Sequence, residues 1–174
     1  MPRLTLLGEE TIKCLNCGEN AFKVMIYVYE VPFFGNVLIE TGVCSKCGFR
    51  KTDVSLAEVS KPKRIILKVK SKKELNALVL KSSTALVRMP ELGIEIAPGP
   101  AAPGYITTVE GILHRVLEHI PAECFDENSQ CYSKVMEIKE AIEGKKEFTV
   151  IIEDPYGRSE IRGKDVEAIE EEIK

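Results

Sequence analysis

The sequence lacks the features of several large classes of protein. Its formal charge is −3 at pH 7, whereas a dedicated nucleic-acid binder usually carries a strong basic excess, because phosphate contacts supply most of its affinity. No apolar run approaches the roughly 20 residues that span a bilayer. Residues 1–13 lack the basic start and apolar stretch of a signal peptide. We therefore expect a cytoplasmic protein that does not enter a membrane.

Familiar catalytic sets are missing as well. No Ser/His/Asp set is recognisable, and the Gly- and Pro-rich segment 98–104 lacks the GK[ST] ending that a phosphate loop needs. The two histidines, His114 and His119, are five residues apart on an expected helix and do not share a face. Analogy of fold alone is a poor reason to assign catalysis. We predict that the protein is not an enzyme.

Two cysteine pairs are the most specific feature of the chain. Each pair has two residues between its cysteines and a glycine after the second: Cys14, Cys17, Gly18 and Cys44, Cys47, Gly48. This spacing lets both thiolates of a pair contact one ion at Zn–S distances of roughly 2.3 Å, and the glycines suit a knuckle with positive φ. Four thiolates leave no open position for a substrate, which favours a structural site. The sequence predicts one structural Zn²⁺ held by Cys14, Cys17, Cys44 and Cys47.

Disulfide or redox roles for these cysteine pairs fit the sequence less well. Two disulfides would be unusual in a reducing cytoplasm, and a redox CxxC motif expects a βαβ context. An iron centre also uses four cysteines and stays open as an alternative. Cys124 and Cys131 lie apart from these pairs; we favour small, buried, unbonded side chains over a disulfide, without settling which.

The segment between the cysteine pairs predicts a β-hairpin. Residues 22–31 are rich in Val, Ile, Tyr and Phe, residues 32–36 supply a turn, and residues 37–43 return. A two-stranded ribbon has little core of its own, so one face should meet the rest of the chain and the other a partner. Coverage of both faces within the chain is an equal alternative. The candidate partner contacts from this hairpin are Tyr27, Tyr29, Phe33 and Phe34.

Lys61 and Pro62 mark the expected boundary between a finger at 1–59 and a β-rich domain at 60–174. Ser71 with Glu74 suggests a capping box and a short helix at 75–80. The last dozen residues are expected as an amphipathic helix or a frayed tail. The other segments expected in this domain are strands at 65–70, 85–87, 93–97, 148–152 and 159–161, a loop at 97–104, and a turn at 154–157.

Two helices are expected in the middle of this domain. The first begins at Thr107 or Thr108, with Thr108 as its cap, and ends at Pro121. The second runs from residue 128 or 129 to Glu143 and stops at Gly144. Together they predict a helical hairpin at about 107–143.

Several motifs in their order resemble the ZPR-type zinc-finger proteins, and specifically their single-module archaeal relatives. The motifs are CLNCG, EVPFFGNVLIETGVCSKCGFRKTDV, MPELGIEI, TTVEGIL and FTVIIEDPYGRSEI. The resemblance covers about residues 12–162. It implies a mainly β fold with α: a zinc-ribbon-like four-cysteine finger, then a β-sandwich or double-stranded β-helix-like domain with an inserted helical hairpin. The segment from Pro98 to Pro103 departs from the usual glycine-rich loop of the family.

The resemblance also implies a function. Eukaryotic members carry two such modules and act as chaperones for the translation elongation factor GTPase that delivers aminoacyl-tRNA, so a zinc-binding module that is a chaperone or adaptor for that GTPase is expected here. Glu91, Glu110 and Asp154 match signature positions and are further candidate contacts. The alternative is a nucleic-acid-binding zinc ribbon that uses the basic residues between Lys61 and Lys73 with Tyr27, Tyr29 and Phe34.

Overall fold

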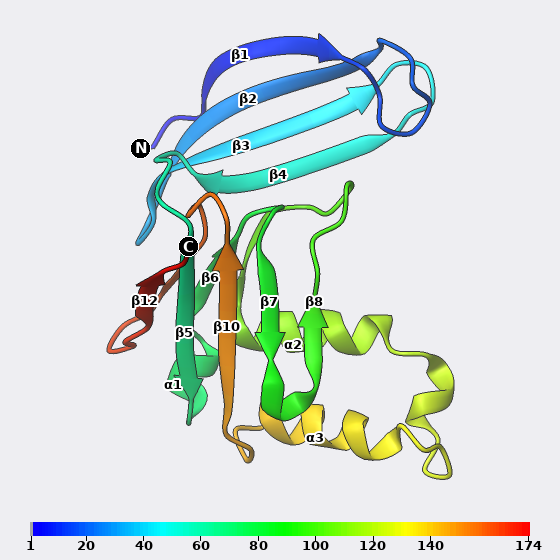
Figure 1. The fold of residues 1–174 in the computed structure, drawn as a ribbon, viewed down its shortest axis with the longest axis vertical. Coiled ribbons are helices and arrows are strands. Elements are labelled where there is room, and N and C mark those ends of the chain that lie inside the picture. The colour runs from blue at the N-terminus through cyan, green and yellow to red at the C-terminus, as the bar shows by residue number, and fades with distance from the viewer. Residues whose placement is uncertain (1) are drawn as a thin grey trace.

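The structure is a computed structural model that describes residues 2–174. A four-stranded sheet lies across one end of a larger β-rich domain, which carries two helices on one side (Figure 1). This is the mainly β fold with an inserted helical hairpin that the sequence predicts. None of the helices in residues 2–174 is long and apolar enough to cross a membrane.

The N-terminal sheet contains the predicted hairpin and two further strands. Its antiparallel order is β1-β2-β3-β4. The prediction of a two-stranded ribbon is wrong, since the sheet has two further strands. The sequence does not reveal β1 and β4, because both carry many polar residues and lack an apolar alternation. The bounds are β1 Thr5–Ile12, β2 Phe22–Val31, β3 Gly35–Cys44 and β4 Arg50–Leu56.

The larger domain is built from two sheets. A five-stranded sheet has the order β12-β5-β10-β7-β8, and a three-stranded sheet has the order β11-β6-β9. Apolar side chains from both sheets and both helices form one core, with Val87, Ile112 and Ile152 fully buried in it. The bounds are β5 Lys63–Val69, β6 Leu78–Lys81, β7 Leu86–Met89, β8 Ile94–Ile96, β9 Tyr105–Thr108, β10 Phe148–Asp154, β11 Glu160–Arg162 and β12 Ile169–Glu172.

The helical hairpin begins and ends close to the predicted positions. Helix α2, Val109–His119, is capped by Thr108, whose side chain accepts a hydrogen bond from the Gly111 amide at 2.9 Å. Helix α3, Tyr132–Ile142, ends before Gly144, which has positive φ. The 3₁₀ turn η2, Ala122–Phe125, lies between the two helices, and a second one, η1, Pro90–Leu92, joins β7 to β8.

Two predicted elements are wrong in type. The Ser71–Glu74 capping box is present, but helix α1, Lys72–Leu75, is a single turn, and residues 78–81 form β6 instead of continuing it. Val79 and Leu80 are fully buried between β9 and β11, so sheet pairing and burial override the local helical preference. Near the C-terminus the chain forms β12, which pairs with β5, rather than a helix or a frayed tail.

Cys124 and Cys131 form a disulfide, so the preference for unbonded side chains is wrong. Turn η2 and the residue before α3 bring the two Cα atoms to 5.0 Å. That separation lies within the range that a disulfide requires. The bridge therefore closes the loop between the two helices.

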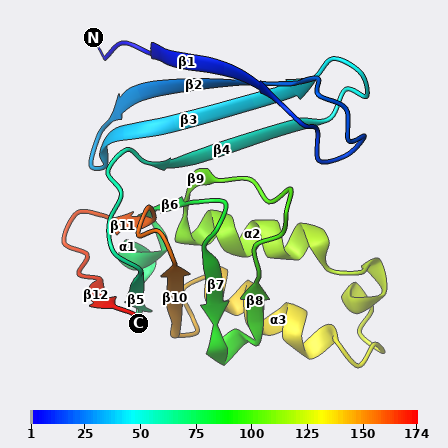
Figure 2. The ribbon, with the colours of Figure 1, turned by 45° about the horizontal axis from the view of Figure 1, so that its top comes forward.

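The two parts of the molecule meet along the edge of β4 (Figure 2). The Leu56 amide donates to the Arg158 carbonyl at 3.0 Å. The Asp53 carboxylate accepts from the Ser83 amide at 3.0 Å and from the Ser83 hydroxyl at 2.5 Å. A shared apolar cluster contains Phe34 and Val37 of the finger and Leu80 of the larger domain. One face of the hairpin therefore does meet the rest of the chain.

Candidate metal centre

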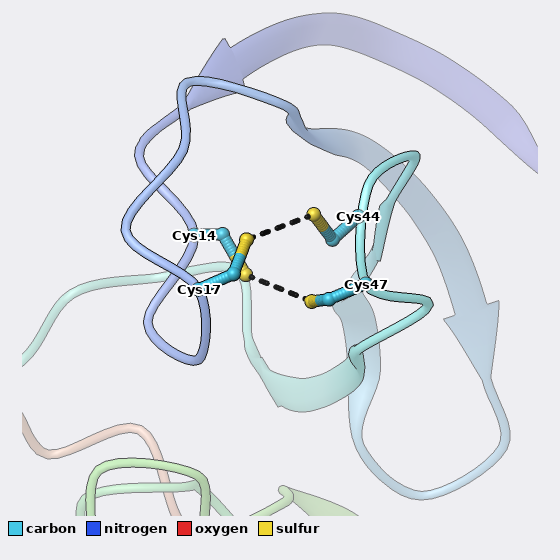
Figure 3. A group of neighbouring side chains, drawn as sticks. All are labelled: Cys14, Cys17, Cys44 and Cys47. Carbon is cyan, nitrogen blue, oxygen red and sulfur yellow. Dashed lines mark hydrogen bonds between the residues drawn. The ribbon is translucent and has the colours of Figure 1, made fainter.

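The four sulfurs of the two cysteine pairs lie together at one end of the N-terminal sheet (Figure 3). All four Sγ atoms are within 4.8 Å of one another. Cys14 Sγ is 3.7 Å from Cys47 Sγ, and Cys17 Sγ is 3.7 Å from Cys44 Sγ. A tetrahedron with Zn–S distances of about 2.3 Å has S···S edges of about 3.8 Å. The cluster therefore fits a four-thiolate zinc site.

Each pair sits on a turn of the same local form. The Gly18 amide donates to the Cys14 carbonyl at 2.9 Å, and the Gly48 amide donates to the Cys44 carbonyl at 3.0 Å. Both glycines have the predicted positive φ, 75° and 73°, which a side chain would disfavour. The turns follow β1 and β3, so the pairing of β2 with both strands brings the two knuckles together.

The surroundings of the two exposed thiols shift their pKa values in opposite directions. The Asn16 side-chain amide donates to Cys47 Sγ at 3.5 Å. This bond, with a backbone hydrogen bond from Phe49, lowers the pKa of Cys47 to about 6. At Cys17 a backbone hydrogen bond from Glu19 favours the thiolate, but burial and the other three cysteines raise its pKa to about 12. Crowded thiolates repel one another, and a divalent cation relieves that repulsion.

The metal centre has a buried side and an exposed side. Cys14 and Cys44 are buried beneath an aromatic pair, Phe22 and Phe49, whose ring centroids are 5.7 Å apart. On the exposed side, Leu15 is 63% and Ile12 is 40% accessible. A shallow groove runs from these two residues along the sheet, and we call it the knuckle groove. Its lining is Ile12, Leu15, Phe22, Val24, Glu40, Thr41, Gly42, Lys51 and Asp53.

Sequence reasoning missed Asn16 as a hydrogen-bond partner of a cysteine sulfur, and Ile12 and Leu15 as exposed apolar residues beside the cluster. Leu15 and Asn16 occupy the variable positions inside a CxxC motif, which carry no signal of their own. Both are exposed in the knuckle, whereas the adjacent Cys14 is buried.

The candidate contacts of the hairpin divide by exposure. Phe33 is 69% accessible in the turn between β2 and β3, while Tyr27 and Tyr29 are half-buried on β2. Phe34 is only 7% accessible, because it packs against Val37 and Leu80. The structure therefore corrects the placement of Phe34 on a contact surface: it holds the two parts of the chain together.

The signature carboxylates lie in the larger domain and do not gather near the metal centre. Glu91 accepts hydrogen bonds from the Thr149 amide at 3.0 Å and the Thr149 hydroxyl at 2.7 Å, which ties η1 to β10. Glu110 lies in the first turn of α2, and its Oε1 atom is 3.4 Å from Nε2 of His114. Glu91 is exposed and Glu110 is partly exposed.

Asp154 is completely buried, so its placement among partner contacts is also corrected. Its carboxylate accepts from the Ser82 hydroxyl at 2.8 Å and the Ser159 hydroxyl at 2.5 Å. The amides of Tyr156 and Arg158 donate to it at 3.0 and 3.1 Å. A carboxylate with these partners organises the turn after β10 and cannot reach a second protein.

The first three basic residues of the segment from Lys61 to Lys73 form ion pairs within the chain. Lys61 pairs with Glu172, Lys63 with Glu170, and Arg64 with both Glu153 and Glu171. The pairs to Glu170, Glu171 and Glu172 form because β12 lies antiparallel to β5, while Glu153 faces Arg64 from β10. The positive charge at the start of this segment is therefore matched by the acidic C-terminus.

A four-thiolate cluster on a β-sheet, followed by a two-sheet domain, defines a zinc-finger protein with a jelly-roll domain. Residues 9–62 match the ZPR1 zinc-finger domain, and residues 73–174 match the ZPR1 jelly-roll domain. The chain belongs to the ZPR1 family, as its motifs indicate, and it is a zinc-binding module.

Relatives in archaea and eukaryotes support this assignment. The chain is 40% identical to an uncharacterized ZPR1-like protein of Methanocaldococcus jannaschii, with 94% of this chain and 86% of the relative covered. It is 36% identical to an uncharacterized ZPR1-like protein of Pyrococcus horikoshii, covering 89% and 74%. It is 31% identical to the zinc finger chaperone zpr1 of Schizosaccharomyces pombe, covering 84% of this chain but 34% of that protein.

Proposed function

We propose that Cys14, Cys17, Cys44 and Cys47 hold one structural zinc ion, and that the module binds a partner protein as a chaperone or adaptor. The observation that carries this proposal is a closed four-thiolate cluster directly beside an exposed apolar groove. A closed shell offers no position for a substrate, while exposed apolar side chains around a rigid site favour protein contact. The Schizosaccharomyces relative bears the name of a chaperone.

The proposed partner is a translation elongation factor GTPase in the cytoplasm, the partner that the family resemblance implies. The knuckle groove mixes apolar walls with Glu40, Lys51 and Asp53, which suits a protein surface of mixed character. Phe33 extends the contact surface to the far end of the sheet, and Tyr27 and Tyr29 lie between the two ends. A few anchor residues, aromatic ones prominent among them, contribute most of the binding energy at such interfaces.

Zinc binding is tested first, on purified full-length chain. The native protein is expected to contain one zinc, and Cys44→Ser is expected to lose it, because a hydroxyl is a much poorer zinc ligand than a thiolate. Zinc released by a thiol-modifying reagent provides the measurement. The matched control is the double change Cys124→Ser and Cys131→Ser, which leaves the cluster intact. Full zinc content in Cys44→Ser would reject this ligand set.

Partner binding is tested by capturing the elongation factor GTPase in its nucleotide-free, GDP-bound and GTP-bound states. Leu15→Ser is expected to weaken capture by about tenfold, as loss of an interface anchor does. Val59→Ser is the matched control, because Val59 is 67% accessible but lies in the linker between the two parts. No capture in any state, by protein that holds one zinc, would remove this partner and leave the zinc site standing.

The alternative of a nucleic-acid-binding ribbon is less well supported. The ion pairs to β12 neutralise Lys61, Lys63 and Arg64, and Phe34 is buried. Binding to nucleic acid would weaken steeply with salt. The capture assay therefore includes a salt series with single-stranded RNA as competitor.

A further inference from the structure

A second hollow lies in the larger domain, away from the metal centre. It has a volume of about 690 Å³ and is formed by β8, α2, η2 and α3. Of these, β8, α2 and α3 lie near one another in both views (Figures 1 and 2). Pockets that hold small ligands are commonly about 300–1,000 Å³ and mostly apolar. The walls here are aliphatic: Ile94, Ile96, Val116, Ile120, Val135 and Ile138.

The mouth of this pocket carries more positive than negative groups. Arg115, His119 and Lys134 line it, with Glu95 as the opposing acid. The Arg115 guanidinium lies 4.3 Å from the centre of the Tyr105 ring. Among the ion pairs of residues 2–174, none involves Arg115, whereas Lys134 pairs with Glu137 at 3.2 Å. Arg115 is thus held in place with its hydrogen-bond donors unused by any carboxylate of the described chain.

The far wall of the pocket is fixed by covalent structure. Pro121, Cys124 and Cys131 line it, and the disulfide closes the loop between α2 and α3. A wall held in this way does not have to be ordered when a ligand enters, and pre-organisation lowers the entropic cost of binding.

We propose that this pocket binds a small amphipathic carboxylate. Its apolar chain lies between β8, α2 and α3, and its carboxylate accepts paired hydrogen bonds from Arg115, whose planar guanidinium matches that group. Glu95 at the same mouth disfavours a more highly charged head group such as a phosphate monoester. This site is separate from the zinc module and does not rest on its partner.

Dodecanoate is the probe, added to zinc-loaded full-length chain below the concentration at which it forms micelles. Calorimetry is expected to show one saturable site, and backbone amide NMR shifts are expected in β8, α2 and α3. Arg115→Gln should weaken binding by about tenfold or more, since a charge-assisted bidentate contact is lost. Arg3→Gln, which removes an exposed arginine beside β1, should leave it unchanged. Dodecanol should bind more weakly than dodecanoate to the native chain.

Val116→Glu gives a second test, because it places a negative charge in the apolar wall and should abolish binding while its NMR spectrum reports the fold. The proposal is overturned if the native chain shows no saturable binding or if the shifts map to the zinc-bearing sheet. Equal affinities of native chain and Arg115→Gln, or of dodecanoate and dodecanol, would likewise overturn it.

Discussion

At the scale of single residues, burial separates side chains that the sequence makes look alike. Phe33 and Phe34 are neighbours, yet one is exposed in a turn and the other packs against Leu80. Glu91 and Asp154 both match signature positions, but both serve the fold through hydrogen bonds to their own chain. Glu91 ties η1 to β10, and Asp154 holds the turn after β10.

Asp154→Asn is expected to destabilise the protein by about 3 kcal/mol, because an amide group replaces one acceptor oxygen and faces buried donors. The free energy of unfolding in urea is the measurement. Asp165→Asn is the matched control: Asp165 is exposed, and its φ of 56° is one that asparagine tolerates. A cost for Asp154→Asn as small as that of the control would show that the buried network contributes little.

At the scale of elements, local signals placed the two long helices well but not the extent of the short one. The Thr108 cap and the stop at Gly144 are both as expected. Helix α1 has its capping box but only one turn, because the following residues pair in a sheet. The strands β1, β4 and β12 have burial patterns with few buried positions, so apolar periodicity could not reveal them.

The capping box predicts a specific pH dependence. A hydrogen bond from the Ser71 hydroxyl, and smaller contributions from hydrogen bonds of backbone amides, lower the pKa of Glu74. A carboxyl with a depressed folded pKa contributes stability that is present above its unfolded pKa of about 4.3 and is lost as pH falls through the folded value. Glu74→Gln keeps an acceptor but does not titrate. Between pH 6 and pH 3 the native chain should therefore lose up to about 1 kcal/mol more than Glu74→Gln.

Urea unfolding at both pH values measures this difference. Glu118→Gln, on the exposed side of α2, is the control and should lose as much stability as the native chain over the same range. Parallel losses in native chain and Glu74→Gln would contradict the assigned role of the capping box.

The disulfide is expected to stabilise the helical hairpin. The bridge closes a loop with a sequence separation of 7 residues. In the chain-entropy description this lowers the conformational entropy of the unfolded chain and stabilises the fold by about 2–3 kcal/mol. The double change Cys124→Ser and Cys131→Ser should lower the free energy of unfolding by that amount. Its zinc content, measured in parallel, should stay at the native level; a loss of zinc would mean that the hairpin and the metal centre are coupled.

At the scale of the whole molecule, the two parts are joined by close backbone contact. Gly104 lies against β4: a Cβ atom there would be 2.5 Å from the Val54 carbonyl oxygen and 2.6 Å from the Val54 amide nitrogen. The added atom would also meet the Asp53 carboxylate, which can rotate, but the Val54 backbone is held in β4 and cannot move aside. The absence of a side chain therefore allows the loop before β9 to reach the zinc-bearing sheet.

Gly104→Ala is expected to cost about 2 kcal/mol or more by forcing the two parts away from each other. The unfolding transition followed by zinc release and the one followed by circular dichroism should then have midpoints that lie further apart. Gly99→Ala, in the same loop but with nothing within 4 Å of the added atom, is the matched control. Coincident unfolding at native stability in Gly104→Ala would show that the junction accommodates a side chain.

The sequence by itself determined the features that depend on short spacing. These are the CxxCG pairs, the hairpin between them, the Thr108 cap, the helix stop at Gly144 and the ordered family motifs. Each resides in a few neighbouring residues, whose geometry is set by local backbone and side-chain chemistry. Only the tertiary structure decided which strands complete each sheet, where Phe34 and Asp154 are buried, that Cys124 meets Cys131, and that β12 pairs with the start of the basic segment. These outcomes depend on residues far apart in the chain, and their burial and pairing arise only when the sheets assemble.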